Sequence, residues 1–279
     1  MMIVLFGGAL AGAAYLLGTQ YGGRWAGAIA AALLVTSPTF LTSATQHGRD
    51  IPCAALWAIA LWAAARPGVR HAALAGMAAA LALAIRPNLV PLAAIVSAIA
   101  ALRANREWRP AAAFATPLAI ALIAAPLLSS YRDPALDALY AGGSVAPHLQ
   151  HLVTWLSESQ TPLIFLSLAV PFLALGGHED RTDQWVLFLS AVAFPLMVAA
   201  CYLFYFSFDE WDELHFVLPA FAPLLAATGA ALVQLGTLAP RRIVAIIGIS
   251  CLVIGVAAHG LAYEKEKADL RVRLLISGD

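Results

Sequence analysis

The chain has 279 residues, of which 62% are hydrophobic and 11% are charged, and its mean hydropathy is +0.82. Because soluble domains carry about 25% charged residues, this composition excludes an ordinary soluble protein. The formal net charge is zero, which excludes the basic character on which nucleic-acid binding depends. Helices satisfy their own backbone hydrogen bonds in lipid, so the expected fold is all-α, a polytopic transmembrane helix bundle that forms a single domain over residues 1–279.

Ten apolar segments predict about ten spans, because a helix needs about 20 mostly apolar residues to cross a bilayer. They cover residues 2–18, 25–44, 51–65, 72–85, 89–102, 110–129, 162–175, 184–206, 216–235 and 243–262. The third, fourth and fifth segments are short for full crossings and are expected to extend into their flanks or to tilt little. The first segment lacks a basic leader and a clear cleavage site, which predicts a retained helix and not a signal peptide.

The arginines of the loops predict the orientation of these spans. Alternate loops hold nine arginines on one side and three on the other, and the positive-inside rule assigns the richer side to the cytoplasm. The nine are Arg24, Arg66, Arg70, Arg103, Arg106, Arg109, Arg181, Arg241 and Arg242, and the three are Arg49, Arg86 and Arg132. The long loop at 131–161 is then an outer, interfacial segment. The polar C-terminal tail at 263–279 also lies outside, where its own basic residues disagree with the rule.

Three cysteines, Cys53, Cys201 and Cys251, lie within or at the edge of apolar runs. Their spacing is not that of a zinc site, because structural zinc sites pair ligands a few residues apart. A free cysteine in an apolar run usually behaves as a small hydrophobic side chain. We therefore predict that all three are core residues.

The segment QHGRDI at 46–51 places His47, Arg49 and Asp50 at the outer end of the second span. Charges beside a membrane span are costly unless they are paired, solvated or functional. One interpretation is therefore a functional site. The other is a solvated turn, with Pro52 in the first turn of the next helix.

Arg86, followed by Pro87 and Asn88, ends a helix of small residues on the same outer side. An outer arginine runs against the loop charges elsewhere, so something is expected to hold it there. Because a guanidinium binds phosphate through two parallel hydrogen bonds, a phosphate contact is one interpretation. The other is an arginine that reaches the lipid headgroups while Pro87 breaks the helix.

The segment FDEWDELH at 208–215 is a third candidate, with four carboxylates at Asp209, Glu210, Asp212 and Glu213 and an imidazole at His215. Clustered carboxylates can bind a divalent cation or supply a general base, or they can form a solvated acidic loop. The sequence contains no Walker A loop, dinucleotide glycine pattern, HExxH or GxSxG, which argues against the usual ATPases, zinc proteases and lipases.

The order of several short motifs carries a resemblance to a known family. The turn GTQYGGR at 18–24 is followed by a helix that contains Ser37-Pro38, and Asp50 then stands in the next outer loop. This arrangement resembles the multi-pass glycosyltransferases of the C superfamily, and in particular the bacterial branch related to protein mannosyltransferases and aminoarabinose transferases. In that family a short cytoplasmic turn joins two helices, the second ends in "SP", and an acidic outer loop follows.

Two later segments continue the same order. LALAIRPN at 81–88 is similar to the family's GLALLTRP stretch and places Arg86, and ELHFVLPAFAPLLAA at 213–227 is similar to YLRFLLPALPLL. His215 departs from the pattern, because an arginine is common at that position. The resemblance covers roughly residues 10–235, and the order of the motifs carries more weight than any one of them.

The resemblance implies transfer of a sugar from a polyprenyl-phosphate donor at the outer leaflet. Asp50 would be a catalytic carboxylate of the second outer loop, able to act as a general base toward an acceptor hydroxyl, and Arg86 would contact the phosphate. Arg49, His47 and His215 would also contact the substrates. The expected partners are a lipid-linked sugar and membrane lipid, and the acidic stretch is a candidate for a divalent cation.

One departure from the family concerns the first outer loop, which usually carries the principal catalytic aspartate. This chain resembles the family only from its second helix onward, so we expect that a preceding helix and loop are missing. A truncated reading frame, a degenerate paralogue and a partner subunit are the interpretations, and the chain alone is expected to be inactive or very slow.

A non-enzymatic membrane protein, such as a transporter or a flippase-like subunit, is the alternative. Transporters often have two matching halves with ionisable groups near the midplane. Here the charges gather at the ends of the spans and no such symmetry is evident, which favours the transferase. The abundance of alanine, glycine and arginine over lysine is typical of high-GC bacteria, and the expected location is the bacterial inner membrane.

Overall fold

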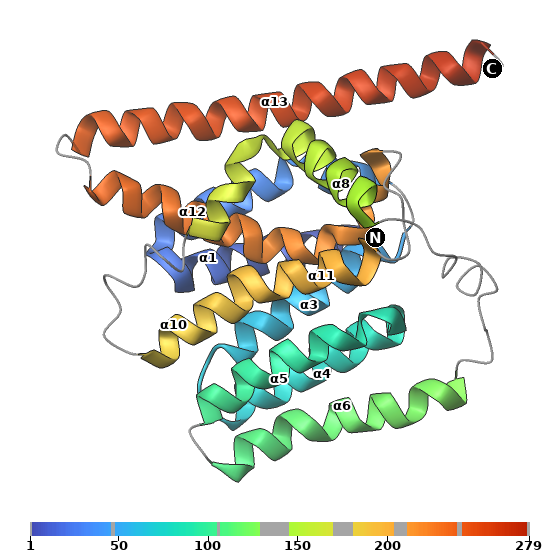
Figure 1. Cartoon of the computed structure of the whole chain (residues 1–279), viewed down its shortest axis with the longest axis vertical. Coiled ribbons are helices and arrows are strands. Elements are labelled where there is room, and N and C mark those ends of the chain that lie inside the picture. Colours follow the sequence, from blue (N-terminus) through green and yellow to red (C-terminus); the bar gives the residue numbers. More distant parts are fainter. Residues whose placement is uncertain are drawn as a thin grey trace.

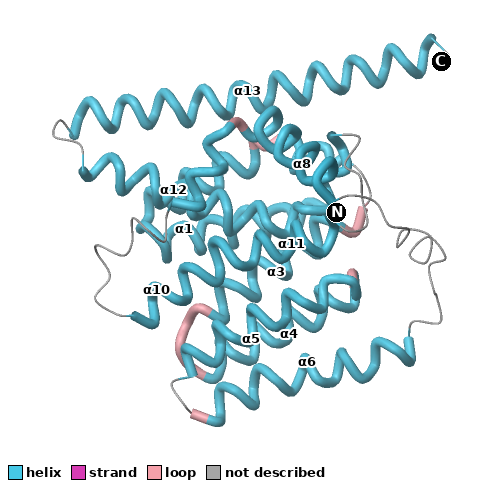
Figure 2. The backbone as a smooth tube through the Cα atoms, in the orientation of Figure 1, coloured by secondary structure: helices cyan, strands magenta, loops and turns pink. Residues whose placement is uncertain are grey.

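The computed structural model describes residues 2–45, 48–104, 107–128, 145–169, 181–203, 211–238 and 242–277. All regular secondary structure in these ranges is helical, which confirms the predicted all-α bundle (Figures 1 and 2). Five of the helices are long and apolar enough to cross a membrane, and three shorter apolar helices accompany them. The protein is therefore a multi-pass membrane protein.

The helices form a stack in which α13 lies along one edge and α6 along the opposite edge (Figure 1). In chain order they are α1 (Met2–Val35), α2 (Pro38–Thr45), α3 (Asp50–Ala64), α4 (Val69–Ile85), the 3₁₀ turn η1 (Pro87–Leu89), α5 (Val90–Ala104), α6 (Trp108–Leu128), α8 (Val145–Gln160), the 3₁₀ helix η2 (Pro162–Ala169), α10 (Arg181–Phe188), the π-helical turn η3 (Leu189–Ala193), α11 (Phe194–Leu203), the 3₁₀ helix η4 (Trp211–Ala220), α12 (Phe221–Leu238) and α13 (Arg242–Ser277). The segments α10, η3 and α11 follow one another without a break, and so do η4 and α12.

Helix α1 is a hairpin of two arms, as the turn predicted at 18–24 requires. Gly22 and Gly23 have non-helical backbone angles, and Gly23 has a φ of 80°, which favours glycine. The two arms touch through their backbones, because a Cβ built on Gly18 would lie 2.8 Å from the carbonyl oxygen of Ala26. Small residues allow this close approach between membrane helices.

The second predicted span, 25–44, is interrupted in the structure. Helix α1 ends at Val35, and the short helix α2 begins at Pro38. Proline has no N–H group to continue a helix and disfavours helical angles at the residue before it, which is Ser37. The prediction of one uninterrupted span was therefore wrong, although the Ser37-Pro38 pair is the cause of the break.

The span predicted at 162–175 begins as the eight-residue 3₁₀ helix η2, and residues 170–175 lie outside the described ranges. The predicted outer loop at 131–161 contains α8 in its second half, whereas residues 131–144 lie outside those ranges. Helix α13 continues as far as Ser277, so the polar tail from residue 263 to residue 277 is helical. The interfacial position of the loop and the outer position of the tail stay predictions.

The core forms where α12 packs against α1 and where α3 lies between α1 and α4. A Cβ on Gly229 of α12 would lie 2.5 Å from the carbonyl oxygen of Ala26, so these helices also meet backbone to backbone. Helix α3 is buried almost throughout. This tight centre sets the relative positions of the ends of α3, α4 and η4.

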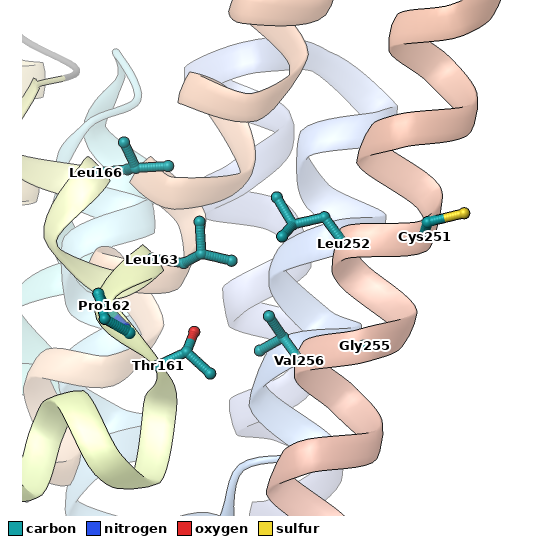
Figure 3. A pocket seen from close by; sticks show the side chains of 8 residues that line it. All are labelled: Thr161, Pro162, Leu163, Leu166, Cys251, Leu252, Gly255 and Val256. Atoms are coloured by element: carbon teal, nitrogen blue, oxygen red, sulfur yellow. The ribbon is translucent and has the colours of Figure 1, made fainter.

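Helix α13 is packed more loosely than the rest. An apolar cavity of about 520 Å³ separates it from η2, with Leu163 and Leu166 facing Leu252 and Val256 (Figure 3). Cys251 also lines this open cavity and is exposed (Figure 3). The prediction of three core cysteines holds for Cys53 and Cys201 and is wrong for Cys251, because the apolar face on which Cys251 lies is not covered by another helix.

The predicted alternation of loops appears as two ends of the stack. The loop from α3 to α4 lies at one end, and the loop from α4 to α5 lies at the other (Figure 2). The first is named the Arg103 end. There Arg103 forms an ion pair with Asp183, and the side-chain amide of Gln20 donates a hydrogen bond to the carbonyl oxygen of Ala65. The second is the Asp50 end. Which end faces the cytoplasm stays a prediction.

Candidate functional site

Asp50 and Arg86, which are 36 residues apart in sequence, form an ion pair at the Asp50 end. The contact joins Nη2 of Arg86 to Oδ1 of Asp50. The side chains are 15% and 12% exposed, respectively, so the pair is largely enclosed. Either charge alone would be costly beside lipid, which favours their convergence. The structure brings them into direct contact.

Local sequence explains how both groups reach this position. Arg86 caps the end of α4 in an extended conformation, with a φ of −136° and a ψ of 89°, as expected for a residue that precedes proline. Its side chain therefore leaves the helix end. Asp50 lies in the first turn of α3, where the helix dipole stabilises a negative charge.

Tyr202, near the end of α11, holds the other edge of the arginine. Its hydroxyl lies 2.8 Å from Nη1 of Arg86, and its side chain is buried. The guanidinium is thus held by a carboxylate on one side and by a phenol on the other. Sequence analysis missed Tyr202, because nothing in its apolar surroundings distinguishes it from a core aromatic residue.

The 3₁₀ helix η4 completes the cluster with His215 and Phe216. Nε2 of His215 lies 3.9 Å from Oδ2 of Asp50. The guanidinium carbon of Arg86 lies 5.1 Å from the centroid of the Phe216 ring, within the range of a cation–π contact. The His215 and Phe216 rings are themselves 4.1 Å apart between centroids. The predicted substrate residue His215 is therefore beside both Asp50 and an aromatic surface.

These groups combine three chemical capacities in one place. The carboxylate can accept a proton, the guanidinium can bind an oxyanion, and the imidazole can donate or accept a proton. Burying an ion pair gains little stability, because desolvation opposes the attraction, whereas leaving one partner unpaired is strongly unfavourable. An enclosed pair with a third titratable group beside it is a functional-site candidate on physical grounds.

Of the other predicted site residues, only Arg49 has a side chain that the structure describes. The Arg49 side chain is exposed at the start of α3. His47, Asp209 and Glu210 lie outside the described ranges, and the side chain of Asp212 is not described either. Among the described residues, no group of three or more histidine, cysteine, aspartate or glutamate side chains could hold a metal ion. A divalent cation at the acidic stretch stays a prediction.

Comparison with known proteins supports the fold. No family model matches the chain, and no curated sequence matches it either. The structure is similar to the crystal structure of ArnT from Cupriavidus metallidurans bound to undecaprenyl phosphate, with a TM-score of 0.55 and 18% sequence identity. The match covers 90% of this chain and 48% of that chain, so the present chain spans about half the length of ArnT. The bundle therefore has a fold similar to that of the matching part of ArnT.

Proposed function

We propose that this protein binds a polyprenyl-phosphate-linked sugar at the Asp50 end and takes part in transfer of the sugar at the extracytoplasmic face of the bacterial inner membrane. The observation that carries this proposal is the enclosed cluster of Asp50, Arg86 and His215. The cluster lies in a fold similar to that of ArnT, whose crystal structure contains undecaprenyl phosphate. A phosphate-binding cation and a proton acceptor in contact suit this reaction.

In the proposed reaction, the guanidinium of Arg86 binds the phosphate oxygens of the donor. A hydroxyl of the acceptor attacks the anomeric carbon of the sugar, and Asp50 takes up the hydroxyl proton. The bond between the anomeric carbon and the phosphate oxygen breaks, and its electron pair stays on the phosphate. Arg86 stabilises the charge that develops there. The exposed Arg49 is a second group for the phosphate at the edge of the site.

Donor binding is the primary test. The protein is reconstituted in nanodiscs and titrated with radiolabelled polyprenyl-phosphate sugars, and transfer to candidate acceptors is then assayed. The change Arg86→Ala should weaken donor binding by about 1.5–3 kcal/mol, because it removes a charge-assisted contact to phosphate. Arg103→Ala is the matched control, since it removes an arginine at the opposite end of the stack.

The alternative of a transporter or flippase-like protein makes a different prediction in the same assay. Such a protein would move its ligand across the bilayer without breaking the sugar–phosphate bond. Absence of donor binding would contradict the transferase proposal and leave this alternative ahead. A divalent cation at the acidic stretch of Asp209, Glu210 and Asp212 is tested separately, by comparing binding with and without a chelator.

A further inference from the structure

The two terminal nitrogens of Arg86 both have partners in the ligand-free structure. Nη2 meets Asp50, and Nη1 meets the hydroxyl of Tyr202. An arginine binds phosphate best through two parallel N–H groups on one edge of its planar fork. Because Asp50 occupies part of that fork, the phosphate of a donor and the carboxylate of Asp50 compete for the guanidinium of Arg86.

The same contact weakens the carboxylate as a proton acceptor. Oδ1 of Asp50 is engaged by Arg86, and Oδ2 faces His215 at 3.9 Å. A carboxylate paired with a guanidinium is a weaker base than a free one, because the cation stabilises its charged form. The ion pair therefore keeps the two proposed functional groups together, while it occupies one donor of Arg86 and makes Asp50 a poorer base.

We propose that the donor phosphate displaces Asp50 from Arg86, and that this displacement frees the carboxylate for proton transfer only when a donor is bound. This inference rests on the proposed function. It adds that, in the absence of donor, the ion pair between Asp50 and Arg86 keeps the site inactive, and this ion pair is called the latch below. Binding of the phosphate thus becomes the signal that activates the base. A latch of this kind would protect the site from reacting before the donor has arrived.

The surroundings identify which partner moves. Arg86 is held by the Tyr202 hydroxyl at 2.8 Å and lies over the Phe216 ring, so it keeps its position when the carboxylate leaves. Asp50 has a short side chain in the first turn of α3, and a rotation about its own bonds is enough to carry it toward His215. The exchange keeps the guanidinium paired, because phosphate replaces carboxylate beside Arg86, and the released carboxylate faces His215.

The experiment measures binding of farnesyl monophosphate, a short prenyl phosphate, to the full chain in detergent by microscale thermophoresis. Farnesol, which lacks the phosphate, is the matched control ligand. Asp50→Asn removes the competing charge but keeps the shape of the side chain. We expect it to tighten farnesyl phosphate binding by roughly threefold to tenfold, equivalent to ~0.7–1.4 kcal/mol, and to leave farnesol binding unchanged.

Arg86→Gln distinguishes the latch from the proposed function. It should weaken farnesyl phosphate binding at least severalfold, whereas farnesol binding stays the same. If Arg86→Gln weakens binding but Asp50→Asn leaves it equal or weaker, the latch is refuted and phosphate binding at Arg86 stands. If no variant, nor the wild type, binds farnesyl phosphate better than farnesol, both the latch and the proposed function are refuted.

A second measurement applies to the wild type, in case Asp50→Asn does not fold. Infrared difference spectra of protein with isotope-labelled aspartate report on the hydrogen bonding of the carboxylates. Farnesyl phosphate should shift one aspartate carboxylate band, because Asp50 loses its guanidinium partner, and farnesol should not shift it. An unchanged aspartate spectrum at saturating farnesyl phosphate would refute the latch.

Discussion

At the Arg103 end, Nη2 of Arg103 meets Oδ1 of Asp183 at 2.5 Å, and their side chains are 20% and 39% exposed, respectively, so the difference from the Asp50 end lies mainly in the carboxylate. At the Asp50 end, Arg86 meets Asp50, whose side chain is only 12% exposed. Both pairs join an arginine to a carboxylate across separate helices, but their surroundings differ. Arg86 also has a phenol and an aromatic ring as partners, and Asp50 has an imidazole beside it.

The difference shows that an ion pair alone does not mark a site. An exposed pair in water contributes about 0–1 kcal/mol and is tolerated wherever charged loops meet. An enclosed pair loses solvation, and its retention needs another reason. At the Asp50 end that reason is the proposed chemistry, whereas the Arg103 end fits a solvated, arginine-rich loop region. Four predictions test this contrast, and they run from an all-or-none outcome to a barely measurable one.

The largest expected effect concerns which end faces the cell exterior. Single cysteines are introduced at Asn105 and at Ser144, in a protein whose exposed Cys251 is replaced by serine. Because the arginine-rich loops are expected in the cytoplasm, an impermeant thiol reagent added to intact cells should label position 144 and spare position 105. Labelling at 105 alone would reverse the orientation and place the Asp50 end inside.

The next largest effect is expected on kcat, which should depend on Asp50 but not on Asp183. If transfer activity is obtained, Asp50→Asn should lower kcat by about 10²–10⁴-fold, the usual contribution of a general base, without weakening donor binding. The matched change Asp183→Asn, at the other end, should leave kcat within experimental error. Equal losses from both changes would mean that the pairs act alike, and the functional contrast between the ends would fail.

Stability should separate the two arginines. Arg86→Ala leaves the enclosed Asp50 carboxylate without its cation and should lower the free energy of unfolding by about 3 kcal/mol. Adding Asp50→Asn should restore most of that loss, because the uncompensated charge is then gone. The measurement is reversible unfolding in mixed micelles, followed by circular dichroism. A double variant as unstable as Arg86→Ala would show that the loss arises from packing and not from charge.

Hydropathy predicted the helices because lipid forces the backbone to bond to itself, but it did not predict which helices are interior. The most apolar stretches of α12 and α13 have mean hydropathies of 2.0 and 2.3, yet 83% of the first is buried against 6% of the second. The difference lies in small residues at the right place. Gly229 of α12 meets the backbone of α1 in the middle of the core, whereas in α13 Gly248 and Gly255 face open space and Gly260 alone of these three approaches another backbone, at Thr36.

The charged and titratable residues of the site could be predicted from the sequence, but a residue that matters only through its position in the fold could not. Asp50, Arg86 and His215 stand out because charges and imidazoles are rare in an apolar chain, and the cost of isolating a charge predicts that Asp50 and Arg86 meet. Tyr202 carries no such signal. Its role depends on the rotation of α11, which brings its hydroxyl to Arg86, and rotation is set by packing against neighbouring helices.

The smallest expected effect belongs to Arg103→Ala. Its partner Asp183 is more than one-third exposed, so the carboxylate that remains is solvated, and the loss of unfolding free energy should stay below about 1 kcal/mol. Added salt should shrink even this loss, because screening already weakens an exposed pair. The assay is the same unfolding titration at low and high salt. A loss as large as that of Arg86→Ala, and insensitive to salt, would show that the Arg103 end is as enclosed as the Asp50 end and would remove the basis for assigning function to one of them.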